Sequence, residues 1–150
     1  MMREKTIIGR VEPVKFPELA EQEYLARIDT GATYSTIWAS ARETNQGLEV
    51  SFFDGKYTKT FSEFFRRGVR NSTGEIQSRY VIKTIISLKG RRVRAKLTLS
   101  DRSNQMYPVL IGRNILRNKF IVDVAQGQAD LKLEKAHRAK IEQLSRRLEK

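Results

Sequence analysis

The sequence contains no cysteine and only one histidine, His137. The absence of cysteine excludes disulfides and thiolate nucleophiles. A catalytic zinc ion usually has three protein ligands that include histidine or cysteine, so a zinc hydrolase is disfavoured and no metal site is predicted. Triads of the Ser–His or Cys–His type are disfavoured for the same reason. Carboxylates remain as the candidate catalytic groups, and we expect no cofactor.

The sequence also lacks a long apolar run. No segment has the roughly 20 consecutive apolar residues that a transmembrane helix needs. Residues 1–9 are charged and lack the apolar centre of a signal peptide. We therefore expect a cytoplasmic protein with no membrane partner; a chain whose export signal had been removed would give the same expectation. With 150 residues, the chain can form one domain with a buried core.

Acidic residues are few compared with basic ones. The 29 Lys and Arg residues against 17 Asp and Glu give a formal net charge of +12. Such an excess favours polyanionic partners: nucleic acid, an anionic surface or an acidic polypeptide. A basic protein with no specific anionic partner explains the charge equally well.

The most informative stretch is Leu25–Ala39, in which an apolar run delivers Asp29 to a break formed by small residues. Gly31 permits a tight turn, and an apolar run resumes at Thr36. A carboxylate at the end of a strand can be held rigidly by backbone N–H groups, as an acid–base aspartate requires. Asp-Thr-Gly is also an ordinary turn sequence, so the tripeptide alone does not establish catalysis.

Short alternating segments with turns between them predict an all-β sandwich or small barrel. Residues 48–52 and 57–61 predict a hairpin that turns at Asp54-Gly55. Residues 79–88 and 91–99 predict a second hairpin that turns at Lys89-Gly90, with a basic outer face. Residues 40–47 are polar and predict a turn or a helical turn.

The last third of the chain predicts two helices. An apolar strand at 108–112 precedes one or two helical turns at 113–118, and a final strand follows at 120–124. In residues 130–150, Leu133, Ile141 and Leu144 recur at helical spacing among charged residues, which predicts a basic amphipathic C-terminal helix. A solvated helix is the simpler interpretation of that segment. We therefore divide the chain into a domain at 1–129 and a helix at 130–150.

The order of these motifs resembles that of retroviral-type aspartic proteases, the retropepsins. Ile28–Ala32 matches their Asp-Thr-Gly loop, and Leu110–Arg113 matches the strand that precedes their short closing helix. The chain is more closely similar to a bacterial retropepsin-like family whose members carry the label ATP-dependent zinc protease. The other matching elements are Asn71–Gly74 with Arg79, Val81–Thr84 and Leu97–Leu99. The resemblance implies a closed small β-barrel with one short helix before the last strand, followed here by the C-terminal helix.

The resemblance also implies a site. Asp29, Thr30 and Gly31 would form the catalytic loop, and because the chain has one such loop, two copies would have to supply Asp29 to a homodimer. Substrate would contact Ala32, a flap tip and the arginine after it: Asn71, Ser72, Thr73, Gly74 and Arg79. Structural support would come from Gly112, Arg113 and Asn114. Viral relatives have an acidic residue shortly after the catalytic loop that pairs with the closing arginine; here Thr33, Tyr34 and Ser35 occupy that stretch, so Arg113 needs another partner.

Some relatives in this family are linked to ligases that add glutamate tails to proteins. A glutamate-tailed or other acidic substrate would suit the charge of the chain and a set of arginines around the flap and second hairpin: Arg66, Arg67, Arg70, Arg79 and Arg92. Two alternatives stay open. One is a catalytically inactive retropepsin-like module that binds peptides or proteins. The other is a nucleic-acid-binding β-barrel, which is less favoured because aromatic residues do not alternate with Lys and Arg on one strand face.

Overall fold

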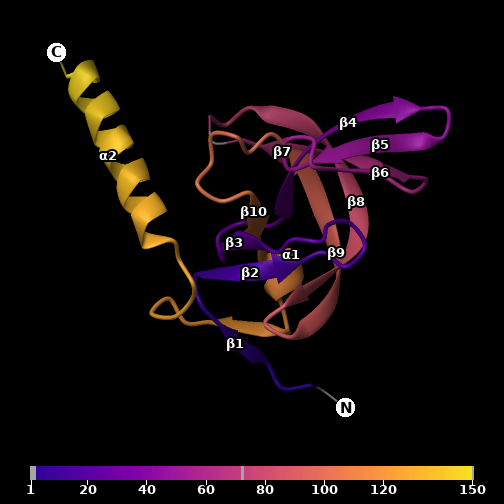
Figure 1. Cartoon of the computed structure of the whole chain (residues 1–150), viewed down its shortest axis with the longest axis horizontal. Coiled ribbons are helices and arrows are strands. Elements are labelled where there is room, and N and C mark those ends of the chain that lie inside the picture. The colour runs from indigo at the N-terminus through magenta and orange to yellow at the C-terminus, as the bar shows by residue number, and fades with distance from the viewer. Residues whose placement is uncertain (1–2, 72, 150) are drawn as a thin grey trace.

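The computed structural model describes residues 3–71 and 73–149, and its centre is a closed barrel of six strands (Figure 1). Around the barrel the strands follow the order β10, β3, β2, β8, β9, β4, and β4 pairs with β10 to close the ring. These strands are β2 (Val11–Lys15), β3 (Tyr24–Ile28), β4 (Ser35–Thr44), β8 (Ile76–Leu88), β9 (Arg91–Ser100) and β10 (Val109–Ile111). The prediction of a closed small β-barrel is confirmed.

The other elements extend or cap the barrel. Strands β5 (Gly47–Phe52) and β6 (Tyr57–Phe61) continue the sheet from β4, and β7 (Phe65–Arg70) pairs with the first half of β8. Strand β1 (Thr6–Ile8) pairs in parallel with β11 (Phe120–Val122) as a separate two-stranded sheet. Helix α1 (Arg113–Leu116) lies between β10 and β11, and α2 (Leu131–Leu148) ends the described chain.

Strand β9 shows how the sequence pattern builds the barrel. Val93, Ala95 and Leu97 point into the core, whereas Arg94 and Lys96 are exposed. This alternation places one face of the strand in the interior and leaves the basic face in solvent. The predicted hairpin between β8 and β9 is confirmed, and its turn places Lys89 and Gly90 at positive φ. The hairpin of β5 and β6, which turns at Asp54 and Gly55, is confirmed as well.

The prediction of a turn at residues 40–47 is wrong. Strand β4 continues through this segment to Thr44 and pairs with β5 along its whole second half. The polar side chains of this segment point outward, and Arg42 pairs with Glu49 on the neighbouring strand at 3.2 Å. Polar residues can form this part of β4 because their side chains reach solvent and because pairs such as Arg42 and Glu49 link the strand to β5. The chain reverses only at residues 45–46.

Helix α2 projects away from the barrel in Figure 1. Its apolar side chains are exposed, whereas the buried residue of the helix is Glu134, which is 8% exposed. Glu134 accepts two hydrogen bonds from the Arg10 guanidinium, at 2.9 and 3.0 Å, and one from the Tyr107 hydroxyl at 2.6 Å. The Asp130 side chain caps the helix by accepting from Leu133 N–H at 2.9 Å. The first turn of α2 is therefore fixed to the barrel by polar contacts.

Candidate functional site

Asp29 follows the last residue of β3 and is held by its own backbone. Its N–H donates to the Ile111 carbonyl at 2.8 Å, because β3 and β10 run in parallel and end together. One carboxylate oxygen accepts from Gly31 N–H at 2.9 Å. A Cβ atom at Gly31 would lie 3.3 Å from this oxygen, a tight contact that favours glycine. Asp29 is half-buried and Thr30 is exposed, so the carboxylate lies at the surface of a rigid loop.

The loop after Asp29 is joined to the start of α1 through backbone contacts. Arg113 N–H donates to the Ala32 carbonyl at 2.8 Å, and Asn114 N–H donates to the Thr33 carbonyl at 3.2 Å. At Gly112 a Cβ atom would lie 2.3 Å from the Tyr34 carbonyl oxygen, so only glycine allows this approach. The two sequence motifs, which lie some eighty positions apart, thus form one unit.

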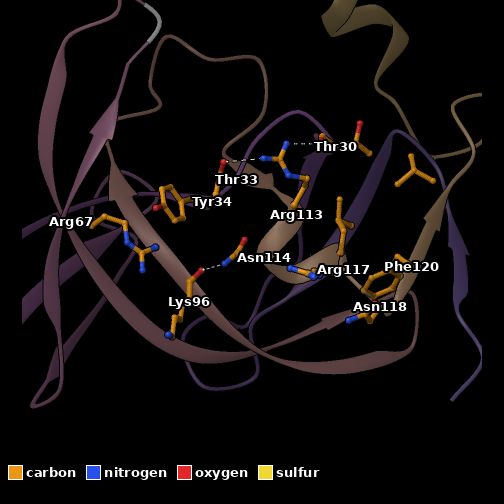
Figure 2. Close-up of a pocket in the computed structure, with 12 residues that line it drawn as sticks. Thr30, Thr33, Tyr34, Arg67, Lys96, Arg113, Asn114, Arg117, Asn118 and Phe120 are labelled. Carbon is orange, nitrogen blue, oxygen red and sulfur yellow. Dashed lines mark hydrogen bonds between the residues drawn. The ribbon is translucent and has the colours of Figure 1, made fainter. Parts of the chain in front are cut away.

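The Arg113 side chain has partners other than a carboxylate. Its guanidinium donates to the Thr30 carbonyl and to the Thr33 hydroxyl, each at 3.1 Å (Figure 2). In viral relatives an acidic side chain pairs with the corresponding arginine. Here the Thr33 hydroxyl and the Thr30 backbone carbonyl take its place. This arrangement connects the guanidinium directly to the residue that follows Asp29.

A buried hydroxyl completes the unit. Ser35 accepts from Gly112 N–H at 2.9 Å and donates to the Asn114 side-chain oxygen at 2.7 Å. The Asn114 amide nitrogen in turn donates to the Lys96 carbonyl at 3.0 Å, which ties α1 to β9. The sequence indicated a hydroxyl-rich stretch after Asp29, but it did not identify Ser35 as the residue that joins the two motifs.

The predicted flap tip lies at the turn of the hairpin formed by β7 and β8. The Asn71 side-chain oxygen accepts from the backbone N–H groups of Thr73 and Glu75, each at 3.0 Å, and from the Thr73 hydroxyl at 2.7 Å. Gly74 has φ of +88°, which a glycine adopts readily. The described polar groups of the tip therefore stabilise the turn itself. Ser72, also predicted to bind substrate, lies outside the described residues.

Arg102 lies close enough to Asp29 and to two other arginines, Arg27 and Arg79, for their charges to affect its pKa. The pKa of Arg102 is lowered to about 10, first by burial and then by the positive charges of Arg27 and Arg79, whereas the negative charge of Asp29 raises it. Burial also lowers the pKa of Arg79, which lies on β8 in the hairpin. Arg102 Nε donates to the Tyr107 carbonyl at 3.0 Å, which fixes this side chain in the loop before β10. Arg102 and the two arginines near it therefore form a cationic cluster beside Asp29.

Of these three arginines the sequence predicted only Arg79. Arg27 could have been found, because it lies two positions before Asp29 in a strand and side chains two apart share a face. Arg102 lies in a polar loop, and no local pattern identifies it. Among the other predicted arginines, Arg66 forms an ion pair with Glu43 at 3.5 Å and lies over the Tyr80 ring. Arg70 and Arg92 are exposed on their strands.

A groove of about 920 Å³ runs beside α1 (Figure 2). Arg67 and Tyr34 lie at one end, Asn118 and Phe120 at the other, and Thr30 lies on its rim. Four basic side chains and no acidic one line it: Arg67, Lys96, Arg113 and Arg117. The Arg67 guanidinium lies 4.2 Å from the centre of the Tyr34 ring, a cation–π contact.

Comparison with protein families matches residues 7–132 to the RimB-like family, described as "Retropepsin-like aspartic endopeptidase RimB". The chain belongs to the RimB-like family. The family resemblance inferred from the motifs is therefore confirmed. The match ends at the beginning of α2, and the proposed division of the chain at residue 129 stays a prediction.

Named relatives of this RimB-like chain are longer proteins. A protein of Shewanella halifaxensis called "Probable alpha-L-glutamate ligase" is 31% identical over 93% of the chain, and the match covers 34% of that protein. A protein of Desulfotalea psychrophila with the same name is 34% identical over 81% of the chain and 28% of its own length. The chain thus spans about a third of the curated relatives it matches.

The fold is shared with a solved structure. A Legionella pneumophila protein of unknown function matches 83% of this chain and 97% of its own, with a TM-score of 0.57 and 21% sequence identity. Within the described part of this RimB-like chain, no group of three or more His, Cys, Asp or Glu side chains is placed to hold a metal ion. Nor does any helix in residues 3–71 and 73–149 have the length and apolar character to cross a membrane.

Proposed function

We propose that the chain is an aspartic endopeptidase that acts as a homodimer, with Asp29 contributed by each copy. The supporting observation is the rigid unit that carries Asp29. Its backbone is hydrogen-bonded to β10, its carboxylate to Gly31, and the following residues to Arg113 and Asn114. A general acid–base carboxylate needs such fixed geometry and access to solvent, and Asp29 has both.

The proposed chemistry requires two carboxylates that share one proton. The ionised carboxylate of one Asp29 takes a proton from water, while the protonated carboxyl group of the partner's Asp29 donates to the carbonyl oxygen of the scissile peptide bond. The water oxygen bonds to the carbonyl carbon. The tetrahedral species then collapses as the C–N bond breaks and the nitrogen takes a proton. Gly31 would let the substrate backbone approach, Thr30 would hold the two loops together, and Ala32 would pack beneath them.

A dimer also suits an exposed apolar surface on β1 and β11. Ile7 and Ile121 are directly paired across β1 and β11 and are 52% and 53% exposed. Val124, 75% exposed, follows on the same segment. Apolar side chains that gather on one exposed surface commonly mark an interface between proteins. The two-fold contact that we propose would cover them.

The proposed substrate is an acidic polypeptide, such as a protein with a glutamate tail. Arg102 lies near Asp29, and Arg27 and Arg79 lie near Arg102, so this cluster would pair with glutamate side chains close to the scissile bond. The relatives that contain this domain are named as glutamate ligases, and about two thirds of their length lies outside the match. A domain that removes glutamates would act on the product of a domain that adds them.

A second candidate function is a retropepsin-like module that binds acidic peptides without cleaving them. It is favoured by one observation: within the described residues, the hydrogen bonds of Asp29 are to backbone groups of its own chain, and no second carboxylate joins them. A nucleic-acid-binding barrel is less well supported. Arg67 lies over the Tyr34 ring and Arg66 lies over the Tyr80 ring, so each ring has a face that a guanidinium occupies in place of a base.

The decisive experiment compares the chain with its Asp29→Asn variant on a peptide that ends in several glutamates and on a glutamine-tailed control. The proposal predicts cleavage of the glutamate-tailed peptide, loss of that cleavage in the variant, and retained binding of the peptide by the variant. Binding by both proteins without cleavage by either would support the binding module. Equal cleavage by both proteins would exclude Asp29 from the chemistry.

A further inference from the structure

The groove beside α1 holds positive charge that no described ion pair neutralises. Residues 3–71 and 73–149 form four ion pairs, and none of them includes Arg67, Lys96, Arg113 or Arg117. Arg113 donates to a carbonyl and a hydroxyl. Arg67 is half-buried and the other three are exposed. Four cations that line one groove without a counter-ion favour an anionic ligand.

Two of these cations are held by aromatic rings in place of carboxylates. The Arg67 guanidinium lies over Tyr34 at 4.2 Å, and Lys96 Nζ lies 6.0 Å from the centre of the Phe65 ring. A charged group that lies over an aromatic ring still has N–H groups that point away from the ring and can donate to a ligand. Arg67 on β7 and Lys96 on β9 therefore present donors to the groove from two different elements.

The position of the groove favours a peptide as its occupant. Thr30, the residue after Asp29, lies on its rim, so the groove begins next to the proposed site of cleavage and runs away from it. A volume of about 920 Å³ can hold several residues of an extended chain. A nucleic acid would need free aromatic faces to stack its bases, and the Tyr34 face is occupied by Arg67.

We propose that this groove is a second binding site for side-chain carboxylates, which lets the protein distinguish long acidic tails from short ones. The inference rests on the proposed function and adds to it. Glutamates next to the scissile bond would contact the arginines around Asp29. Glutamates farther along the tail would reach Arg67 and Lys96, so a tail gains these contacts only when it is long enough to enter the groove.

The test uses peptides whose glutamate tails lengthen one residue at a time and measures kcat/KM for each. We expect kcat/KM to rise above a threshold length and then to level off. In the variants Lys96→Ala and Arg67→Ala the ratio of kcat/KM for long and short tails should fall by about twofold to fivefold, as expected for exposed ion pairs. The matched control is Arg94→Ala, which removes the same charge from the same face of β9, two positions away from Lys96 and outside the groove. Its ratio should equal that of the unchanged chain.

A parallel binding series keeps the inference separate from catalysis. In the Asp29→Asn variant, the affinity for long tails should exceed that for short tails, and Lys96→Ala in the same background should remove the difference.

If the chain cleaves all lengths equally well, the distal site is refuted and the proposed function stands. If long tails bind in a Lys96-dependent manner but no tail is cleaved, the distal site stands and the proposed chemistry is refuted. A single-stranded oligonucleotide that binds more tightly than the long tail and depends on Lys96 would overturn the assignment to peptide.

Discussion

The hydroxyl of Tyr107 donates a 2.6 Å hydrogen bond to the Glu134 carboxylate, although the two residues lie on different elements. The carbonyl of the same tyrosine accepts from Arg102 Nε at 3.0 Å. One buried residue, through its hydroxyl and its backbone carbonyl, therefore connects the first turn of α2 with Arg102, which lies near Asp29. The C-terminal helix is thereby linked to the surroundings of the proposed site without contacting it.

Replacing Tyr107 with phenylalanine should destabilise the fold by about 1.5–3 kcal/mol, because it removes a hydrogen bond to a buried charged group. The measurement is the free energy of unfolding in urea. The matched control is Tyr34→Phe, whose hydroxyl forms no hydrogen bond within the described residues and should matter little for stability. Equal losses in the two variants would contradict the role of the Tyr107 hydroxyl.

Acid should release the first turn of α2. Hydrogen bonds from Arg10 and then Tyr107 lower the pKa of Glu134 from its ordinary value of 4.5. A carboxylate with a lowered pKa contributes stability that is complete above its unfolded pKa and is lost as pH falls through its folded pKa. Thermal unfolding of the Glu134→Gln variant should therefore depend less on pH below about 4.5 than that of the unchanged chain. Glu142→Gln, on the exposed part of α2, serves as the control; if its pH dependence changes as much as that of Glu134→Gln, the linkage is refuted.

The contact between the two motifs should be intolerant of a single methyl group. A Cβ atom at Gly112 would lie 2.3 Å from the Tyr34 carbonyl and 2.8 Å from that of Ala32. Gly112→Ala should therefore cost more than about 3 kcal/mol of stability, since backbone atoms must move apart. Gly90→Ala meets no atom within 4 Å and strains only its φ of +76°, so it should cost about 1 kcal/mol. Similar unfolding free energies for the two variants would contradict the close approach.

Charge selectivity should depend on Arg102. The change Arg102→Gln should lower kcat/KM for a glutamate-containing peptide by about tenfold relative to a matched glutamine-containing peptide. Arg94→Gln removes an equal charge from the exposed face of β9 and should leave that ratio unchanged. A decrease of equal size for both peptides would show that Arg102 supports the loop and does not select the substrate.

Much of the fold could be predicted because its signals are local. Three of these signals need only a few neighbouring residues: the alternation of apolar and charged residues around Leu97, the turn at Gly90, and the glycine that precedes Arg113. The motifs also predicted Asp29 as a catalytic residue and Arg113 as structural support, but not the partners of Arg113, which are the Thr30 carbonyl and the Thr33 hydroxyl. Residues 40–47 were assigned wrongly because a polar segment gives no local sign that a neighbouring strand will pair with it.

The contacts around the site were less predictable because they join distant parts of the chain. Arg10 and Glu134 are 124 positions apart, and their pairing follows from the path of the chain and not from any pattern. The apolar spacing of Ile141 and Leu144 identified α2 as a helix, yet the residue that fixes this helix to the barrel is an acid. Arg102 likewise approaches Asp29 through the folding of a polar loop.

The central claim is that two copies of Asp29 share one site, and a subunit-mixing experiment tests it most directly. The unchanged chain is mixed with increasing amounts of Asp29→Asn, the subunits are allowed to exchange, and cleavage of a glutamate-tailed peptide is measured per mole of unchanged chain. If both carboxylates are needed, every mixed dimer is inactive, and activity per unchanged chain falls in proportion to the fraction of variant, to half in an equal mixture. If each chain carries a complete site, activity per unchanged chain stays constant at every ratio, and the shared-aspartate mechanism is refuted.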